Sequence, residues 1–383
     1  MPKLPSFLLE VAPLVPLPGA REPVFTYTSE VSVPKGSVVS ISFGRRQLEG
    51  VVISSRRNKN APKSQGVKLK KIDSVLEPKA LTVKQVRLAE ALGSEYFTPL
   101  GKTLGHFWMP RVKARKQEAF SETSAKLIPS AEEKKHIASW RKGRKPFFLD
   151  MAQTDNIWRW PALLTDRVLT EKKQTLILVP ELTLLDPLSR FFREFFPGEM
   201  LATIGSTLSP GLLSENWERI RNGEARIILA TRQGLFAPFQ DLGLIIVTYE
   251  EDMSYKEWHQ APRYHAKRVA SLLAEEHDAR LVLASPTGSL ESFWGLAQKN
   301  FLPFLPENKG VSMHHLEIVN LREERYRKNF SPFSRRLEEA VGQTIAEHKQ
   351  VLLGVSRSGM SRFSICTHCR TLLRCPPLRP DAE

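Results

Sequence analysis

Two short stretches combine aromatic rings with positive charge, which is the chemistry that single-stranded nucleic acid requires. "SYKEWHQAPRYHAKR" (254–268) contains Lys256, Trp258, Arg263 and Tyr264, and "FGRR" consists of Phe43, Gly44, Arg45 and Arg46. Aromatic rings stack on bases, while lysine and arginine neutralise the phosphate backbone. Both stretches therefore predict DNA contacts. The alternatives are that the two rings of the longer stretch are packing residues and that "FGRR" is an ordinary hairpin end.

The three cysteines of the chain, Cys366, Cys369 and Cys375, lie within ten residues of one another. A cysteine pattern of this spacing in a chain without a secretory signal indicates part of a metal site rather than a disulfide framework. Three thiolates can hold zinc together with a water or with His368. Exposed reactive thiols are the alternative interpretation.

A third stretch, "PFFLDMAQTDNIWRW" (146–160), lies where a nucleotide-binding α/β domain carries its phosphate loop. It is followed by a helical pattern over 161–170 and the apolar strand "TLILVP" (175–180). The turn contains neither glycine nor lysine, and the pattern G-x4-G-K-[ST] occurs nowhere in the chain. Phosphate loops need glycine for close backbone approach and lysine for charge. ATP and magnesium are therefore not expected as cofactors.

Positive charge is concentrated in the first part of the chain. Residues 1–145 contain 27 basic and 12 acidic side chains, whereas residues 146–383 contain 29 of each. Clustered lysine and arginine favour a polyanionic partner, most directly nucleic acid, and a solubilising surface is the alternative. The chain contains no apolar run long enough for a membrane span and no secretory signal pattern. A cytoplasmic protein without membrane contact is the expectation.

The pattern of apolar runs predicts the elements that position these residues. Residues 1–110 alternate apolar and polar side chains between glycines, which indicates a small β-rich domain, and a helical stripe follows at 82–96. Residues 111–145 are expected to form a basic linker with one short helix. From 146 to 330, five apolar strands alternate with helices, which predicts a parallel α/β sheet covered on both faces. A helix at 333–349 and the strand "QVLLGVSR" (350–357) begin a second α/β unit within 331–383.

The order of several motifs resembles that of the PriA family, the superfamily-2 DNA helicases of replication restart. The motifs are "SFGRRQLEGVV" (42–52), "LVPELTLL" (178–185), "NGEARIILATRQGLFAPF" (222–239), "EEDMSYKEWHQAPRYHAKRVA" (250–270) and "SPTGSLES" (285–292). The resemblance implies a 3′-DNA-end-binding domain, a RecA-like helicase lobe and the start of a second lobe. It also implies that the winged-helix region is reduced to the linker.

The same resemblance aligns the family's phosphate loop, GVTGSGKT, with residues 151–158. Ile157 then replaces the lysine, Trp158 replaces the threonine, and all three glycines are changed. The family's acidic motif DEEHD aligns with Thr248, Tyr249, Glu250, Glu251 and Asp252. The first aspartate of that motif positions magnesium and the next glutamate prepares water. Both functional positions are altered, so no catalytic residue is expected to be intact, and only a charge-pairing remnant is expected at 250–252.

Further DNA-facing positions follow from the resemblance. The family's "FDY" segment, whose aspartate recognises a 3′ hydroxyl, aligns with Phe25, Thr26 and Tyr27, so Thr26 lacks the anionic acceptor. Thr231 and Arg232 follow a strand where related motors contact a backbone phosphate. The family's two-zinc cysteine array aligns with the three cysteines, with Leu378 at the fourth position.

These observations predict a DNA-binding, PriA-like protein of replication restart, acting on branched or single-stranded DNA without ATPase or helicase activity. The expected partners are DNA and other replication-restart proteins. The alternatives are an active ATP-dependent 3′-to-5′ helicase with a divergent nucleotide site and a nonfunctional fragment.

Overall fold

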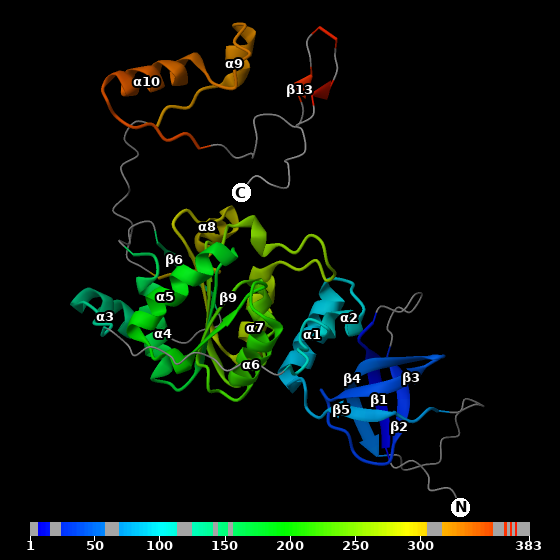
Figure 1. Ribbon diagram of the computed structural model, residues 1–383. Helices are drawn as coiled ribbons and strands as arrows, with labels where there is room; N and C mark the ends of the chain where they lie inside the picture. The colour runs from blue at the N-terminus through cyan, green and yellow to red at the C-terminus, as the bar shows by residue number, and fades with distance from the viewer. Residues whose placement is uncertain are drawn as a thin grey trace, which may run out of the picture. The chain divides into compact units, whose positions relative to one another are not determined.

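The computed structural model describes residues 7–15, 24–57, 69–112, 125–140, 145–151, 156–304, 316–354, 364–365, 368–369 and 372–373. The chain divides into two compact units, Met1–Lys309 and Gly310–Glu383. The first contains an antiparallel sheet, two helices and an α/β lobe, and the second contains short elements near the C-terminus (Figure 1). Among the described residues, no helix has both the length and the apolar character needed to span a bilayer.

The N-terminal sheet has five antiparallel strands in the order β2-β1-β4-β3-β5. They are β1 (Phe7–Pro13), β2 (Phe25–Ser29), β3 (Val38–Phe43), β4 (Arg46–Arg57) and β5 (Ser74–Glu77). The backbone from Lys70 to Asp73 bonds to β2 on one side and to β3 on the other. Because this segment leads directly into the edge strand β5 and also bonds to β2 at the other edge, it links the two edges of the sheet around a core that includes Leu9, Val39 and Ile41. The predicted β-rich domain is confirmed.

Only part of the alternating stretch at 30–44 forms a strand. Gly36 has a φ of 85°, and a Cβ atom there would lie 2.1 Å from the carbonyl oxygen of Leu81. Only glycine tolerates both the left-handed backbone and this close approach. The chain therefore turns before Val38.

Two helices follow the sheet, namely α1 (Val83–Glu95) and α2 (Leu100–Leu104). Thr82 and Gln85 form a capping box, in which each side chain accepts a hydrogen bond from the other residue's backbone N–H. The predicted helix at 82–96 is confirmed. Gln85 is 5% exposed and donates through Nε2 to the carbonyl oxygen of Phe236, 2.8 Å away in the α/β lobe. The helix and the lobe therefore share one core.

The α/β lobe contains a seven-stranded parallel sheet in the order β12-β6-β11-β10-β7-β9-β8. Its strands are β6 (Phe147–Asp150), β7 (Gln174–Leu178), β8 (Leu201–Ile204), β9 (Ile227–Ala230), β10 (Leu242–Thr248), β11 (Arg280–Ser285) and β12 (Leu302–Pro303). The five predicted strands are confirmed. The sequence interpretation missed β8, which has four residues, and β12, which has two and contains a proline.

Helices cover both faces of this sheet. They are α3 (Ala131–Ser139), α4 (Arg159–Leu169), α5 (Leu185–Phe195), α6 (Pro210–Arg221), α7 (Ala266–His277) and α8 (Leu290–Ala297), with the 3₁₀ turns η1 (Leu182–Leu184), η2 (Gly198–Met200), η3 (Arg232–Phe236) and η4 (Met253–Tyr255). In β7, Leu176 and Leu178 belong to one hydrophobic cluster, and Ile177 belongs to the other. Continuous apolar strands are the expected sequence of a sheet buried on both faces.

The second unit contains α9 (Leu321–Tyr326), α10 (Arg335–Ala346), β13 (Ser364–Ile365) and β14 (Leu372–Leu373). The predicted helix at 333–349 is confirmed as α10. The predicted strand at 350–357 is wrong over its described part, because Val351–Gly354 has no strand structure and Leu352 is 97% exposed. A strand needs a hydrogen-bonded neighbour, and the described residues of this unit do not provide one for it.

His277, the last residue of α7, couples the stability of the first unit to pH. It is 7% exposed, and its Nδ1 lies 3.3 Å from Lys84 Nζ on α1. Burial and, secondly, the charge of Lys84 lower its pKa from the ordinary 6.5 to about 4. The pKa of His277 is lower in the folded state than in the unfolded state. Its contribution to the free energy of unfolding is therefore fully present above pH 6.5 and is lost as the pH falls toward 4.

We therefore expect the free energy of unfolding to fall by on the order of 2–3 kcal/mol between neutral pH and about pH 4 through this one group. Denaturant unfolding of the wild type and of His277→Gln at both pH values measures the effect. The variant should lose less stability than the wild type on acidification. An equal loss in both proteins would show that His277 does not carry this dependence.

Candidate nucleic-acid interface

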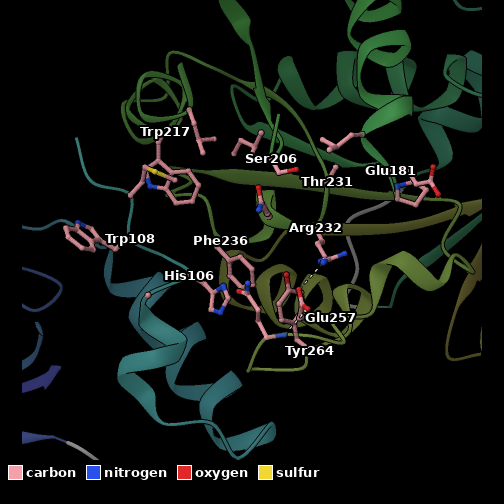
Figure 2. A pocket seen from close by; sticks show the side chains of 18 residues that line it. His106, Trp108, Glu181, Ser206, Trp217, Thr231, Arg232, Phe236, Glu257 and Tyr264 are labelled. Carbon is pink, nitrogen blue, oxygen red and sulfur yellow. Dashed lines mark hydrogen bonds and ion pairs between the residues drawn. The ribbon is translucent and has the colours of Figure 1, made fainter. Parts of the chain in front are cut away.

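A cavity of about 510 Å³ opens at the carboxyl edge of the parallel sheet (Figure 2). Parallel strands place their following loops at the same edge, where α/β proteins bind ligands. Three such loops, those after β7, β8 and β9, line the cavity together with the loop after η4 and the segment after α2. Its side chains include His106, Trp108, Glu181, Ser206, Trp217, Thr231, Arg232, Phe236, Glu257 and Tyr264.

Arg232 is held in this cavity by the loop that follows β10. Its Nη2 lies 2.9 Å from Glu257 Oε2, and its Nη1 donates to the carbonyl oxygen of Ser254 at 2.8 Å. Glu257 also accepts the backbone N–H groups of His259 and Gln260. Burial opposes ionisation of Glu257, but these donors outweigh it and lower its pKa. Arg232 is thus positioned by the loop, and one third of its side chain stays exposed.

The aromatic residues of that loop divide into buried and exposed ones. Tyr264 is 2% exposed, its ring packs edge-on against Phe236 at 5.2 Å, and burial raises its pKa. Trp258 is 54% exposed. Lys256 Nζ lies 5.8 Å from the centre of the Trp258 ring and 5.7 Å from that of Tyr96. The exposed side chains of this loop are therefore Trp258 and Arg263, with the half-buried Lys256 beside Trp258, whereas Tyr264 supports the fold.

The cavity contains residues that the sequence interpretation missed. His106 lies beside Phe236, with ring centres 5.3 Å apart, and a ring nitrogen lies 3.3 Å from the carbonyl oxygen of Ala261. Burial lowers the pKa of His106. Trp108 and Trp217 also line the cavity. No sequence pattern marks these three residues, because Trp217 lies in α6, far along the chain from His106 and Trp108, and joins them only through packing.

The "FGRR" stretch forms the hairpin between β3 and β4, and its predicted contact with DNA stays a prediction. Phe43 pairs with Arg46 across the turn, and Gly44 has the positive φ, 60°, that this turn requires. Arg45 and Arg46 are exposed. The rings of Phe25 and Phe43 meet edge-on at 4.9 Å, so β2 approaches the hairpin.

The surroundings of this hairpin are polar. Tyr27 is 4% exposed and donates to the carbonyl oxygen of Ser42 at 3.4 Å, whereas Thr26 is exposed. Ser42 Oγ donates to Asp73, and Lys70 Nζ donates to the carbonyl oxygens of Ser42 and Gly44. Lys70 and Asp73, which the sequence interpretation did not select, thus bring a cation and an anion to the hairpin.

The segment aligned with a phosphate loop is described at its two ends only, because residues 152–155 lie outside the described ranges. Met151 is 1% exposed and Trp158 is 8% exposed, and both belong to the core of the lobe, with Ile157 packed against it. The Trp158 ring meets the Tyr249 ring edge-on, with centres 6.2 Å apart. Two positions separated widely in sequence therefore contact each other through aromatic rings.

The acidic stretch after β10 is engaged in contacts within the lobe. The buried Glu250 forms an ion pair with Lys267 at 2.5 Å and accepts from the backbone and side chain of Ser289. Burial opposes its ionisation, but these donors lower its pKa. Glu251 accepts from Thr287 Oγ1 at 2.7 Å, and Asp252 caps η4. Thr248 is buried and donates to the carbonyl oxygen of Leu178.

The cysteine prediction stays untested. Cys369 is exposed, while Cys366 and Cys375 lie outside the described residues. Within the described part of the chain, no group of three or more His, Cys, Asp or Glu side chains is arranged to hold a metal ion.

Known proteins match this chain in a family model and in whole-sequence comparisons. The family model "3′DNA-binding domain (3′BD)" of PriA matches residues 13–108. Replication restart protein PriA of Bacillus subtilis is 37% identical over 214 residues, which are 55% of this chain and 26% of that protein. The protein of the same name from Rickettsia conorii is 25% identical over 380 residues, or 97% and 56% of the two chains. This chain thus spans between about a quarter and just over half of these relatives.

Among solved structures, the helicase domain of Pyrococcus furiosus Hef aligns with a TM-score of 0.33 and 17% identity. The alignment covers 46% of this chain and 38% of that one.

Proposed function

Because the chain belongs to the PriA family of helicase-like replication restart proteins, we propose that it binds branched or single-stranded DNA in replication restart and does not hydrolyse ATP. Other replication-restart proteins are the partners that we propose for it. The observation that carries the absence of ATP hydrolysis is the contact between Trp158 and Tyr249.

Aromatic contact at these positions is incompatible with the usual chemistry of a nucleotide site. A phosphate loop presents backbone N–H groups, a lysine and a hydroxyl, and its acidic partner presents a magnesium-binding carboxylate. The corresponding positions here hold Ile157, Trp158, Thr248 and Tyr249. The Thr248 hydroxyl donates to a backbone carbonyl, and the Trp158 and Tyr249 rings pack edge-on against each other. No carboxylate and no lysine is left at these positions to bind magnesium or phosphate.

The groups suited to DNA are placed differently, since they face solvent. Arg45 and Arg46 extend from a hairpin within the segment that matches the 3′-DNA-binding family model. Lys256 lies against the exposed Trp258 ring, so a base can stack on the indole while the ammonium group meets a phosphate. These two surfaces supply the phosphate neutralisation and stacking that sequence-independent binding needs.

The test combines two measurements on the full chain. Fork DNA and single-stranded DNA should bind with an affinity that falls as salt rises, and ATP turnover should stay at the buffer level with and without DNA. Replacing both Arg45 and Arg46 by alanine should weaken binding roughly tenfold and reduce the slope of log affinity against log salt by about 1.5–2.

Arg322→Ala combined with Arg325→Ala is the matched control, because it removes two exposed arginines of α9. The control should bind as the wild type does. DNA-stimulated turnover above the buffer level would contradict the inactive assignment. DNA affinity that does not respond to salt would contradict the DNA-binding assignment.

A further inference from the structure

We propose that the cavity at the carboxyl edge of the sheet takes one unstacked nucleobase from the bound single strand. This inference rests on the proposed DNA-binding function and assigns a base-binding site to the cavity. Its volume, about 510 Å³, lies within the range of roughly 300–1,000 Å³ found for pockets that enclose small ligands.

The lining of the cavity suits a flat heterocycle. The rings of His106, Trp108, Trp217, Phe236 and Tyr264 line one side of it (Figure 2). Ring-lined walls stack on any base because every base has a π-face. A flexible aliphatic ligand gains no comparable advantage from such walls.

Two hydrogen-bond donors in the lining lack a partner. The indole N–H groups of Trp108 and Trp217 are buried, and neither meets an acceptor among the described residues. Trp217 is only 3% exposed, so its N–H is removed from bulk solvent. Buried donors are nearly always satisfied in folded proteins. Base edges carry ring nitrogens and carbonyl oxygens that accept such donors.

The charges of the cavity favour an uncharged ligand over a phosphate group. Its only cation among the lining residues, Arg232, forms an ion pair with Glu257, and Glu181 adds a second carboxylate. A phosphate would meet one neutralised guanidinium and the repulsion of two carboxylates.

The phosphate-binding groups lie next to the cavity instead. The loop that supplies Glu257, Gln260 and Tyr264 to the lining also carries the exposed Trp258 and Arg263 and the half-buried Lys256. A strand whose backbone contacts Lys256 and Arg263 can direct one base inward and leave the next to stack on Trp258.

A blocking substitution tests the assignment. Ser206 lines the cavity and is exposed, so Ser206→Phe places a ring in the cavity without disturbing the core. Thr207→Phe is the matched control, because Thr207 is the exposed next residue and does not line the cavity. Trp217→Phe keeps a ring and removes one unpaired N–H.

Fluorescence anisotropy with full-length protein compares a 15-nucleotide thymidine strand with an abasic strand of the same length. Ser206→Phe should weaken binding of the thymidine strand roughly tenfold and leave binding of the abasic strand and the salt slope unchanged. Trp217→Phe should weaken only the thymidine strand, by a few fold. Thr207→Phe should match the wild type for both strands.

Equal thymidine-strand affinity in the wild type and in Ser206→Phe would overturn the base-pocket proposal while leaving DNA binding intact. A wild type that binds neither strand would overturn both proposals. Free deoxynucleosides form the last arm of the test. Saturable binding of a nucleoside to the wild type but not to Ser206→Phe, without any strand dependence, would assign the pocket to a free base and overturn the strand assignment.

Discussion

Replacing Trp158 by alanine should lower the free energy of unfolding by about 3–5 kcal/mol. Trp158 is 8% exposed, packs in the core of the lobe and contacts Tyr249 through its ring. Truncation removes a large apolar side chain and leaves a cavity that the surrounding strands fill only in part. Denaturant unfolding of the full chain, followed by a signal of the first unit, measures the loss.

Trp258→Ala is the control for that measurement, because Trp258 is the same residue type but is 54% exposed. It should change stability by no more than about 0.5 kcal/mol. If Trp158→Ala had an equally small effect, Trp158 would not be a packing residue, and the structural argument against a phosphate site at this position would fail.

Replacing Lys267 by methionine should destabilise the lobe by about 3–5 kcal/mol at neutral pH. The Glu250 side chain is fully buried, and Lys267 Nζ lies 2.5 Å from its carboxylate. Without the ammonium group, a buried anion remains with only the neutral donors of Ser289 and Ser292. The retained methionine chain keeps most of the packing of the lysine stem, so the loss reports on charge.

The pH dependence separates this effect from a simple packing defect. In the wild type the pKa of Glu250 lies below its ordinary value. The contribution of Glu250 to the free energy of unfolding is therefore fully present above that ordinary value and is lost as the pH falls through the folded pKa. In Lys267→Met, burial is no longer offset and the pKa should rise. The stability difference between the two proteins should therefore shrink in acid.

Two further variants complete the design. Glu250→Gln in the Lys267→Met background should recover part of the stability, since it removes the unpaired charge. Lys71→Met is the control, because Lys71 and Glu30 form an exposed pair at 2.9 Å and such pairs contribute only about 0–1 kcal/mol. A stability difference that does not vary with pH would contradict the charge explanation.

The fold class followed from local pattern alone. The strands β7, β10 and β11 each contain a continuous apolar run, and such runs separated by helices indicate a parallel sheet covered on both faces. The helix α1 could also be predicted from sequence, because its apolar stripe and its Thr82–Gln85 capping box are local features. The strand β8 was missed because a threonine interrupts its four residues, whereas β6 and β9 are equally short but have three or more consecutive apolar residues, and β12 was missed because it has only two residues.

The sequence did not predict which side chains of the candidate interface are buried. Tyr264 and Trp258 occur in one aromatic loop, yet the first is buried and the second is exposed. Their difference arises from Phe236, which reaches the loop from a different strand connection. The expected strand at 350–357 failed over Val351–Gly354 for a related reason, since strand formation requires a neighbouring strand and not only apolar residues.

From the pattern of its residues alone, the chain was predicted to form a small β-rich domain followed by a parallel α/β lobe. Its resemblance to the PriA family added the prediction that the residues where phosphate and magnesium would bind are altered. Only the tertiary structure revealed the contact between Trp158 and Tyr249, the ion pair of Glu250 with Lys267 and the ring-lined cavity. Each depends on side chains from separate segments that meet at one edge of the sheet. Periodicity and spacing describe a residue's own element, whereas these contacts depend on how several elements pack together.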